Sequence, residues 1–152
     1  MRRPPNLRST LSRLLALLGA VACQPQAPTV IEITAVNYAF QAPHTVAPGP
    51  ARLRLINAGT VAHEVQVFAF KAGISADSGR ALLSTLDRVP DSLADSSGAV
   101  LIAAAHTTAP EEVYVELQPG RAYALLCQLR DSPTAKRHDR LGMFGALQVT
   151  AR

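Results

Sequence analysis

The amino-acid sequence predicts an all-β fold, an antiparallel β-sandwich interrupted by one partly helical insertion. Three observations carry this prediction. Short segments alternate apolar and polar residues, as strands with one buried face do. Turn-forming residues such as proline, glycine and asparagine separate these segments at short intervals, which is typical of a sandwich. Finally, 152 residues are enough for one domain with a substantial core, and no internal repeat is visible.

The N-terminus has the composition of an export signal. Four arginines precede residue 14, and the short apolar run at 14–22 is too short to cross a bilayer. Residues 20–23, Ala-Val-Ala-Cys, resemble the lipobox of bacterial lipoproteins. We therefore expect residues 1–22 to be a signal peptide and Cys23 to become the lipidated N-terminal residue. The alternative is ordinary signal cleavage with an incidental cysteine.

Residues 23–29 contain two prolines and no hydrophobic period, so they are expected to form a tether to a domain at 30–152. Removing the signal leaves eleven basic and eleven acidic residues. The basic isoelectric point therefore belongs mainly to the leader and does not indicate nucleic-acid binding. We expect an exported monomer anchored to a membrane on its periplasmic or other extracytoplasmic side.

The strands follow in order along the domain. Residues 52–56 alternate arginine with apolar residues, whereas 122–129 is largely apolar and is expected to be a buried strand. The segments with strand character are 30–40, 52–56, 64–70, 99–104, 112–117, 122–129 and 144–150.

Residues 71–98 lack this alternation and are expected to form an insertion between the two halves of the sandwich. Residues 78–86 have the spacing of a short amphipathic helix, which Asp77 or Ser78 would cap. The four aspartates of this stretch are expected to form a solvated face.

Four residues carry the chemistry: Cys127, His138 and Met143 in order near the C-terminus, and His63 far upstream. A thiolate, two imidazoles and a thioether are the ligands of a blue-copper centre, with the thioether as a weak axial donor. If Cys23 carries lipid, Cys127 has no disulfide partner, and coordination would explain a lone exported thiol. The alternative is a buried cysteine that acts as a small apolar residue. The other histidines, His44 and His106, are expected at the surface.

From about residue 30 to 150 the chain resembles the cupredoxins. In that family the first histidine begins a middle strand, and the other ligands come from the loop before the last strand. The resemblance implies a Greek-key, cupredoxin-like sandwich that binds one copper ion through His63, Cys127, His138 and Met143.

Two departures from the familiar pattern bear on the site. The ten residues at 128–137 make a longer loop than electron-transfer cupredoxins use, although the turn expected at 131–134 would fold it back. A less characterised set of cupredoxin-like bacterial lipoproteins is similar here, since Cys, an Asp-Pro-type turn, His and Gly-Met recur in them. The second departure is Glu64, where many blue-copper proteins carry Asn or Ser, so the hydrogen bonds around the metal would differ.

Three functions remain open. The first is a one-electron carrier with a redox partner protein, using an apolar patch at 141–144 beside an exposed His138 imidazole. Four basic residues around the predicted ligand loop, called the basic rim below, would attract an acidic partner. The second is a copper-handling protein for storage or delivery, although the open Met- and His-rich tracts typical of such proteins are missing. The third is a metal-free binding or structural lipoprotein. We expect no enzyme, because no second ligand cluster or nucleophile motif is visible. The basic rim consists of Arg130, Lys136, Arg137 and Arg140.

Overall fold

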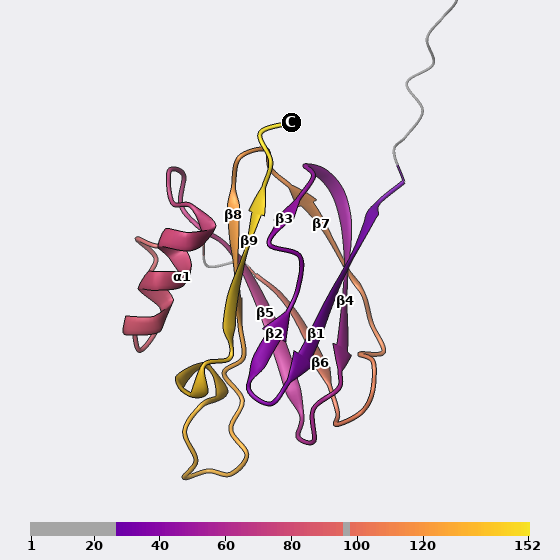
Figure 1. Ribbon diagram of the computed structural model, residues 1–152, viewed down its shortest axis with the longest axis vertical. Coiled ribbons are helices and arrows are strands. Elements are labelled where there is room, and N and C mark those ends of the chain that lie inside the picture. The colour runs from indigo at the N-terminus through magenta and orange to yellow at the C-terminus, as the bar shows by residue number, and fades with distance from the viewer. Residues whose placement is uncertain (1–26, 96–97) are drawn as a thin grey trace, which may run out of the picture.

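Two β-sheets pack face to face in the computed structural model, which describes residues 27–95 and 98–152 (Figure 1). The expected signal peptide, Cys23 and most of the expected tether lie outside these residues. The elements are β1 Thr29–Val36, β2 Ala39–Gln41, β3 Thr45–Val46, β4 Gly49–Asn57, β5 His63–Ala69, α1 Ala76–Thr85, β6 Ala99–Ala103, β7 Val113–Leu117, β8 Ala122–Leu126, the 3₁₀ helix η1 His138–Leu141 and β9 Phe144–Val149.

The strand order confirms the predicted sandwich and adds two parallel pairs. One sheet has the order β2-β1-β4-β7 and the other β3-β9-β8-β5-β6. Strand β1 runs parallel to β4, and β3 runs parallel to β9, while the remaining pairs are antiparallel. The sequence did not indicate these directions, because an alternating strand has the same pattern whichever way its neighbour runs.

The core lies between the sheets, where alternate residues of each strand point. Ile31 and Ile33 of β1 meet Val65 of β5 and Leu147 of β9 there, and all four are buried. Strand β8 differs because all five of its residues are buried. Leu125 points into the core, whereas the small Ala122 and Ala124 face the other side of the sheet.

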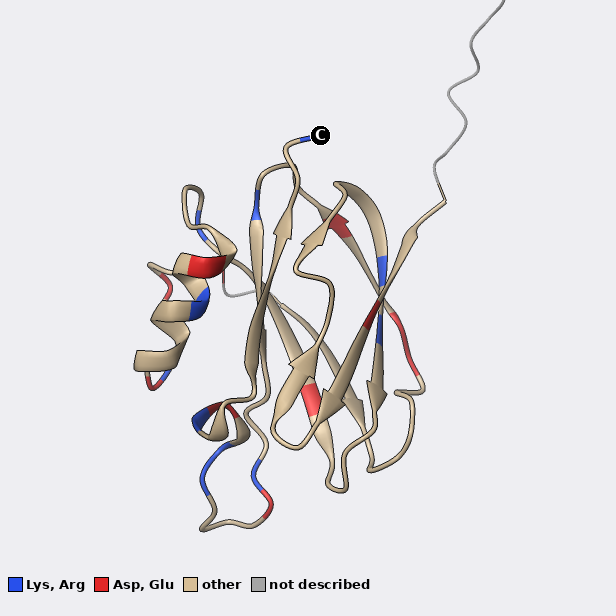
Figure 2. Ribbon diagram, in the orientation of Figure 1, with Lys and Arg blue, Asp and Glu red and all other residues tan. Residues whose placement is uncertain are grey.

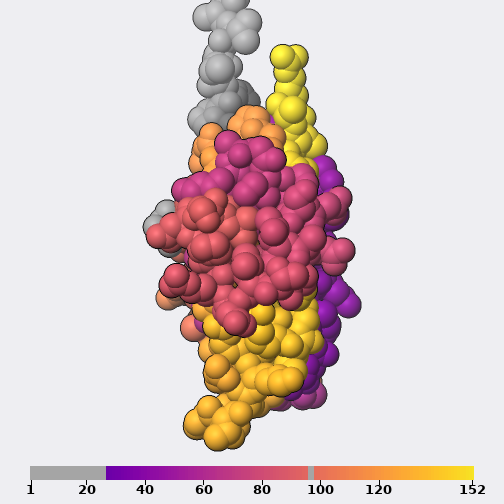
Figure 3. Space-filling view, turned by 90° about the vertical axis from the view of Figure 1, so that its left-hand side faces the viewer, coloured from indigo at the N-terminus to yellow at the C-terminus, as the bar shows by residue number. Residues whose placement is uncertain are grey.

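The insertion covers that other side of the sheet. Helix α1 packs on β8 and β9, and Figure 3 shows the insertion spread over this face above the loop that precedes β9. The strands on either side of the insertion, β5 and β6, are antiparallel neighbours in one sheet. The chain therefore leaves and re-enters the same sheet, rather than passing between the two halves of the sandwich.

Helix α1 begins earlier than its amphipathic pattern predicted. Ser75, and not Asp77 or Ser78, is the N-cap, and its hydroxyl accepts a hydrogen bond from the Ser78 N–H at 3.2 Å. Gly79 lies directly against the ring of the buried Phe70, where a Cβ atom would collide. Among the described residues, no helix is long and apolar enough to cross a membrane.

Candidate metal centre

The backbone brings the predicted ligands to one end of the sandwich. His63 is the first residue of β5, and Cys127 directly follows β8, which pairs with β5. The loop after Cys127 then folds back, because the His138 N–H donates to the Leu129 carbonyl at 2.9 Å and the Met143 N–H donates to the His138 carbonyl at 2.9 Å. Strand pairing thus positions two of the predicted ligands, and a locally bonded loop positions the other two.

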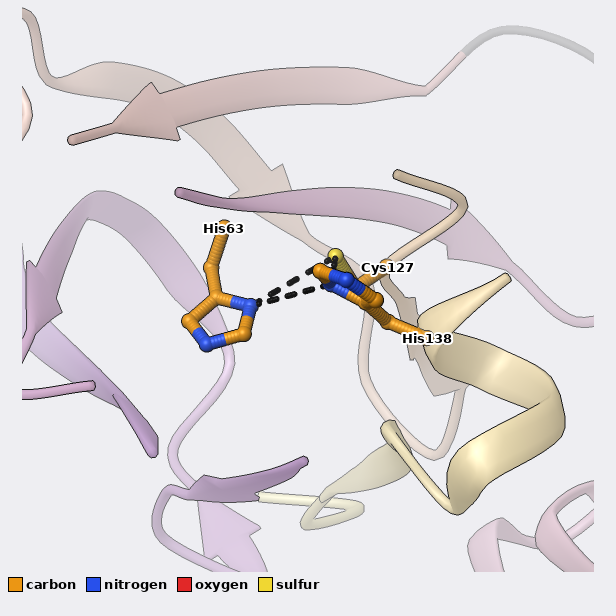
Figure 4. Close-up of side chains that lie close together, drawn as sticks. All are labelled: His63, Cys127 and His138. Carbon is orange, nitrogen blue, oxygen red and sulfur yellow. Dashed lines mark hydrogen bonds between the residues drawn. The ribbon is translucent and has the colours of Figure 1, made fainter. Parts of the chain in front are cut away.

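Three of the four predicted ligands converge. The Cys127 Sγ lies 3.3 Å from His138 Nδ1 and 4.0 Å from His63 Nδ1, and the two Nδ1 atoms are 3.2 Å apart (Figure 4). All three residues are buried. A triangle of this size leaves a point about 2 Å from every corner, which is the length of a metal–imidazole bond. The donor set and its spacing therefore fit one small metal ion.

The other nitrogen of each imidazole shows which atom is free to bind metal. His63 Nε2 lies 3.0 Å from Asn37 Oδ1, and the Thr60 N–H donates to the same Asn37 atom at 3.1 Å. Because Asn37 accepts here, His63 must donate from Nε2, which leaves its Nδ1 lone pair bare. His138 Nε2 lies 2.9 Å from Asp131 Oδ1, so the same argument leaves the Nδ1 of His138 bare.

The charge states in the metal-free protein follow from burial. Burial, with the neighbouring His138, lowers the pKa of His63, so its imidazole is held neutral, as a ligand requires. Burial raises the pKa of the Cys127 thiol to about 11. Its sulfur is therefore protonated at neutral pH, and a metal must displace that proton to gain the thiolate.

Glu64, the second departure from the familiar cupredoxin pattern, forms three hydrogen bonds around Cys127. Its carboxylate accepts from the Gln128 N–H at 3.0 Å and from Gln66 Nε2 at 2.7 Å. The Glu64 N–H in turn points at the Cys127 Sγ at 3.5 Å. Glu64 thus ties the start of β5 to the Cys127 sulfur and to the residue that follows it, with a carboxylate as the acceptor.

Met143 is fully buried and belongs to the same core cluster as Cys127. Its carbonyl accepts from the Cys127 N–H at 3.2 Å, so the two residues are neighbours across the start of β9. Its role as an axial ligand stays a prediction. The other two histidines, His44 and His106, are exposed, as expected.

One expectation about His138 is wrong. Its imidazole is buried, at 1 % exposure, and its Nε2 is bonded to Asp131 instead of facing solvent. The cause is the long loop at 128–137. The turn expected at 131–134 forms one residue later, with the Ala135 N–H donating to the Ser132 carbonyl at 3.1 Å, and the fold of the loop brings Asp131 to the ring.

Sequence reasoning missed three residues at this site. Asn37 and Tyr38 lie at the corner between β1 and β2, and Asp131 lies in the segment 131–134, for which the sequence predicts only a turn. Polar residues at turns are common and usually only solvated, so the sequence contains no signal that marks them as partners of the histidines.

Comparisons with known proteins confirm the fold. The sequence matches no protein-family model and no curated protein. Among solved structures, dithionite-reduced auracyanin from the photosynthetic bacterium Roseiflexus castenholzii is 22 % identical, with a TM-score of 0.50 over 82 % of this chain and 99 % of that one. Auracyanin B is 18 % identical, with a TM-score of 0.51 over 84 % of this chain and 93 % of that one. The predicted cupredoxin sandwich is therefore the fold of this chain.

Proposed function

We propose that this protein is a one-electron carrier whose copper ion is bound by His63, Cys127 and His138, with Met143 as the weak axial ligand. The observation that supports this most directly is the buried triangle of one sulfur and two bare imidazole nitrogens. Such a donor set accepts both Cu(I) and Cu(II), and it is built into a rigid sandwich that need not rearrange when an electron arrives. A fold neighbour, auracyanin, is known in a reduced form, which agrees with redox chemistry on this scaffold.

The protein's own residues would act in three ways. His63 and His138 offer Nδ1 because Asn37 and Asp131 accept from the opposite nitrogens. Burial keeps water from the metal. The Glu64 N–H, aimed at the sulfur, would stabilise the Cys127 thiolate once the metal has displaced its proton. Copper would supply the single-electron couple.

The burial of the centre argues for a carrier over a copper-delivery protein. His63, Cys127 and His138 expose at most 1 % of their surface, whereas handing over an ion requires ligands that a partner can reach. A metal-free binding or structural role remains the outcome if no copper is retained.

Copper loading tests the proposal. Metal analysis after addition of Cu(II) should give one equivalent, with an intense visible absorption from the thiolate. Cys127→Ser should abolish that absorption, and His44→Ala, a change at an exposed histidine whose side chain contacts Asp77 of α1, should leave it intact. If Cys127→Ser keeps the absorption, Cys127 is not a ligand. If the unmodified protein does not retain copper, the carrier function is rejected.

We further propose that the basic rim binds an acidic redox partner beside the metal. Its four residues and Asp87 line an open cavity of about 500 Å³, and Lys and Arg segments gather along this loop (Figure 2). Arg137 and Arg140 share the buried Asp139, whereas Lys136 and Arg130 contribute charge at the edge. Electron exchange with an anionic inorganic oxidant should slow as salt rises, and slow further in Lys136→Glu. No dependence on salt would count against the rim.

The remaining part of the proposal concerns location. We propose that the protein is exported and anchored to a membrane by lipid on Cys23, which keeps the carrier close to membrane-bound redox partners. Cys23→Ala should release the protein from the membrane fraction. Continued membrane association without lipid on mass spectrometry would contradict this anchor.

A further inference from the structure

Tyr38, Asp131 and His138 form a hydrogen-bonded chain at the metal end of the sandwich. The Tyr38 hydroxyl donates to Asp131 Oδ2 at 2.5 Å, and Asp131 Oδ1 lies 2.9 Å from His138 Nε2. The Tyr38 ring also lies against the His138 ring, with centroids 4.9 Å apart and a 57° tilt. Residues 93 positions apart in the sequence therefore meet over one imidazole.

Only one assignment of donors and acceptors satisfies these two hydrogen bonds. An ionised carboxylate accepts but does not donate, so both Tyr38 and His138 must donate to Asp131. When the His138 ring carries a single proton, that proton therefore sits on Nε2, and the Nδ1 lone pair faces Cys127 and His63. Without the carboxylate, the ring could carry its proton on Nδ1 instead, the form that cannot bind metal there.

The unusual length of the loop at 128–137 has a use in this arrangement. Two contacts fold it back on itself: the Ala135 N–H bonds the Ser132 carbonyl, and the His138 N–H bonds the Leu129 carbonyl. This fold places Asp131 beside the ring of a ligand that lies seven residues later. A short loop between Cys127 and His138 would have no residue available for this position.

We propose that Asp131 is a positioning residue for the copper ligand His138, and that Tyr38 acts by fixing Asp131. This inference rests on the proposed function. The carboxylate selects the imidazole form that binds, so it raises copper affinity. Its negative charge, transmitted through the ring, favours Cu(II), which carries one more positive charge than Cu(I). Asp131 therefore lowers the reduction potential of the centre.

The first measurement needs no copper. Nitrogen-15 NMR of the metal-free protein reports which nitrogen of His138 carries the proton. The unmodified protein and the control Asp91→Asn, a change at an exposed aspartate of the insertion, should show the Nε2–H form. Asp131→Ala should shift His138 toward a mixture of the two forms. The same NMR populations in Asp131→Ala and in the control would overturn the proposal.

The second measurement uses the copper-loaded protein. Asp131→Ala should weaken copper binding about 10- to 100-fold, which is the usual effect of losing such a partner. Asp131→Asn keeps the shape of the side chain without its charge, so it should raise the reduction potential while it retains most of the affinity. A potential that Asp131→Asn leaves unchanged would overturn the electrostatic part of the proposal.

Tyr38 is tested through its dependence on Asp131. Tyr38→Phe removes only the hydroxyl and should weaken copper binding by less than Asp131→Ala does. The same change made in Asp131→Ala should have no further effect, and Tyr114→Phe, at an exposed tyrosine, should have none in either background. Equal effects of Tyr38→Phe in both backgrounds would show that Tyr38 does not act through Asp131. If no variant binds copper, the proposed function fails, whereas the NMR populations still decide the positioning role of Asp131.

Discussion

Two regions next to strand β8, its face beneath α1 and its C-terminal end at Cys127, are stabilised in different ways. On one side, α1 and its flanking segments pack apolar side chains such as Phe70 and Leu83 onto the alanines of the strand. On the other side, the strand leads into Cys127, where buried polar groups such as His63, Glu64 and Asn57 each have hydrogen-bond partners. The insertion and its flanking residues stabilise the fold by burying apolar side chains. The end of the sandwich that contains Cys127 instead fixes the positions of polar side chains. Damage to the first region should therefore lower stability, and damage to the second should change metal properties.

The largest expected effect on stability lies beneath α1, at the residue that directly precedes the insertion. Phe70 is fully buried against Gly79, and Phe70→Ala should lower the free energy of unfolding by about 3–5 kcal/mol through lost burial and a cavity. Chemical denaturation measures this change. The reduction potential of the folded, copper-loaded variant should stay at its original value, and a shifted potential would show that the two regions are not independent.

A smaller loss of stability, joined to a change at the metal, is expected at Glu64. Glu64→Ala removes the acceptor of the partly buried Gln128 N–H, and leaving such a donor unpaired should cost about 1 kcal/mol, the lower end of the range for fully buried donors. Losing a buried negative charge beside the thiolate should also raise the reduction potential. Denaturation and voltammetry on the same variant measure both effects. Lower stability with an unchanged potential would place Glu64 with the purely structural residues.

Copper affinity should depend on pH through Cys127. Its pKa of about 11 means that copper displaces one proton from sulfur at any pH well below that value, while the neutral His63 has none to lose. Affinity should therefore rise about tenfold, or about 1.4 kcal/mol, for each unit of increasing pH between 7 and 9. Competition titrations with a chelator of known proton affinity provide the measurement, and affinity independent of pH would contradict a protonated thiol.

The smallest expected change in stability is at Met143. Met143→Leu nearly conserves volume and should cost less than about 1.5 kcal/mol. If the thioether is the axial ligand, the variant should keep its copper and its colour but show a higher reduction potential, because the oxidised ion loses a donor. Identical voltammograms for the two proteins would remove Met143 from the site and leave a three-ligand centre.

The sequence determined much of the fold because burial is a local signal. Alternation located most strands to within a few residues, although it did not separate β1 from β2 and did not predict β3. The largely apolar segment 122–129 correctly indicated a strand buried on both faces, which ends at Leu126. The order His63, Cys127, His138 was also sufficient to identify three side chains that meet in space. Helix α1 was predicted, but its cap was placed at Asp77 or Ser78 because several residues there can cap and only one does, Ser75.

Only the tertiary structure decided strand direction and the partners of the ligands. Parallel pairing of β1 with β4 leaves no mark on an alternating sequence. Asn37, Tyr38 and Asp131 have no sequence pattern that sets them apart from solvated turn residues, and they reach the histidines because the sandwich and the loop fold them together. A ligand's identity follows from its own chemistry, whereas its orientation depends on neighbours distant in the sequence. For that reason the sequence could predict His138 as a ligand, and only the fold could show that it is buried and bonded to Asp131.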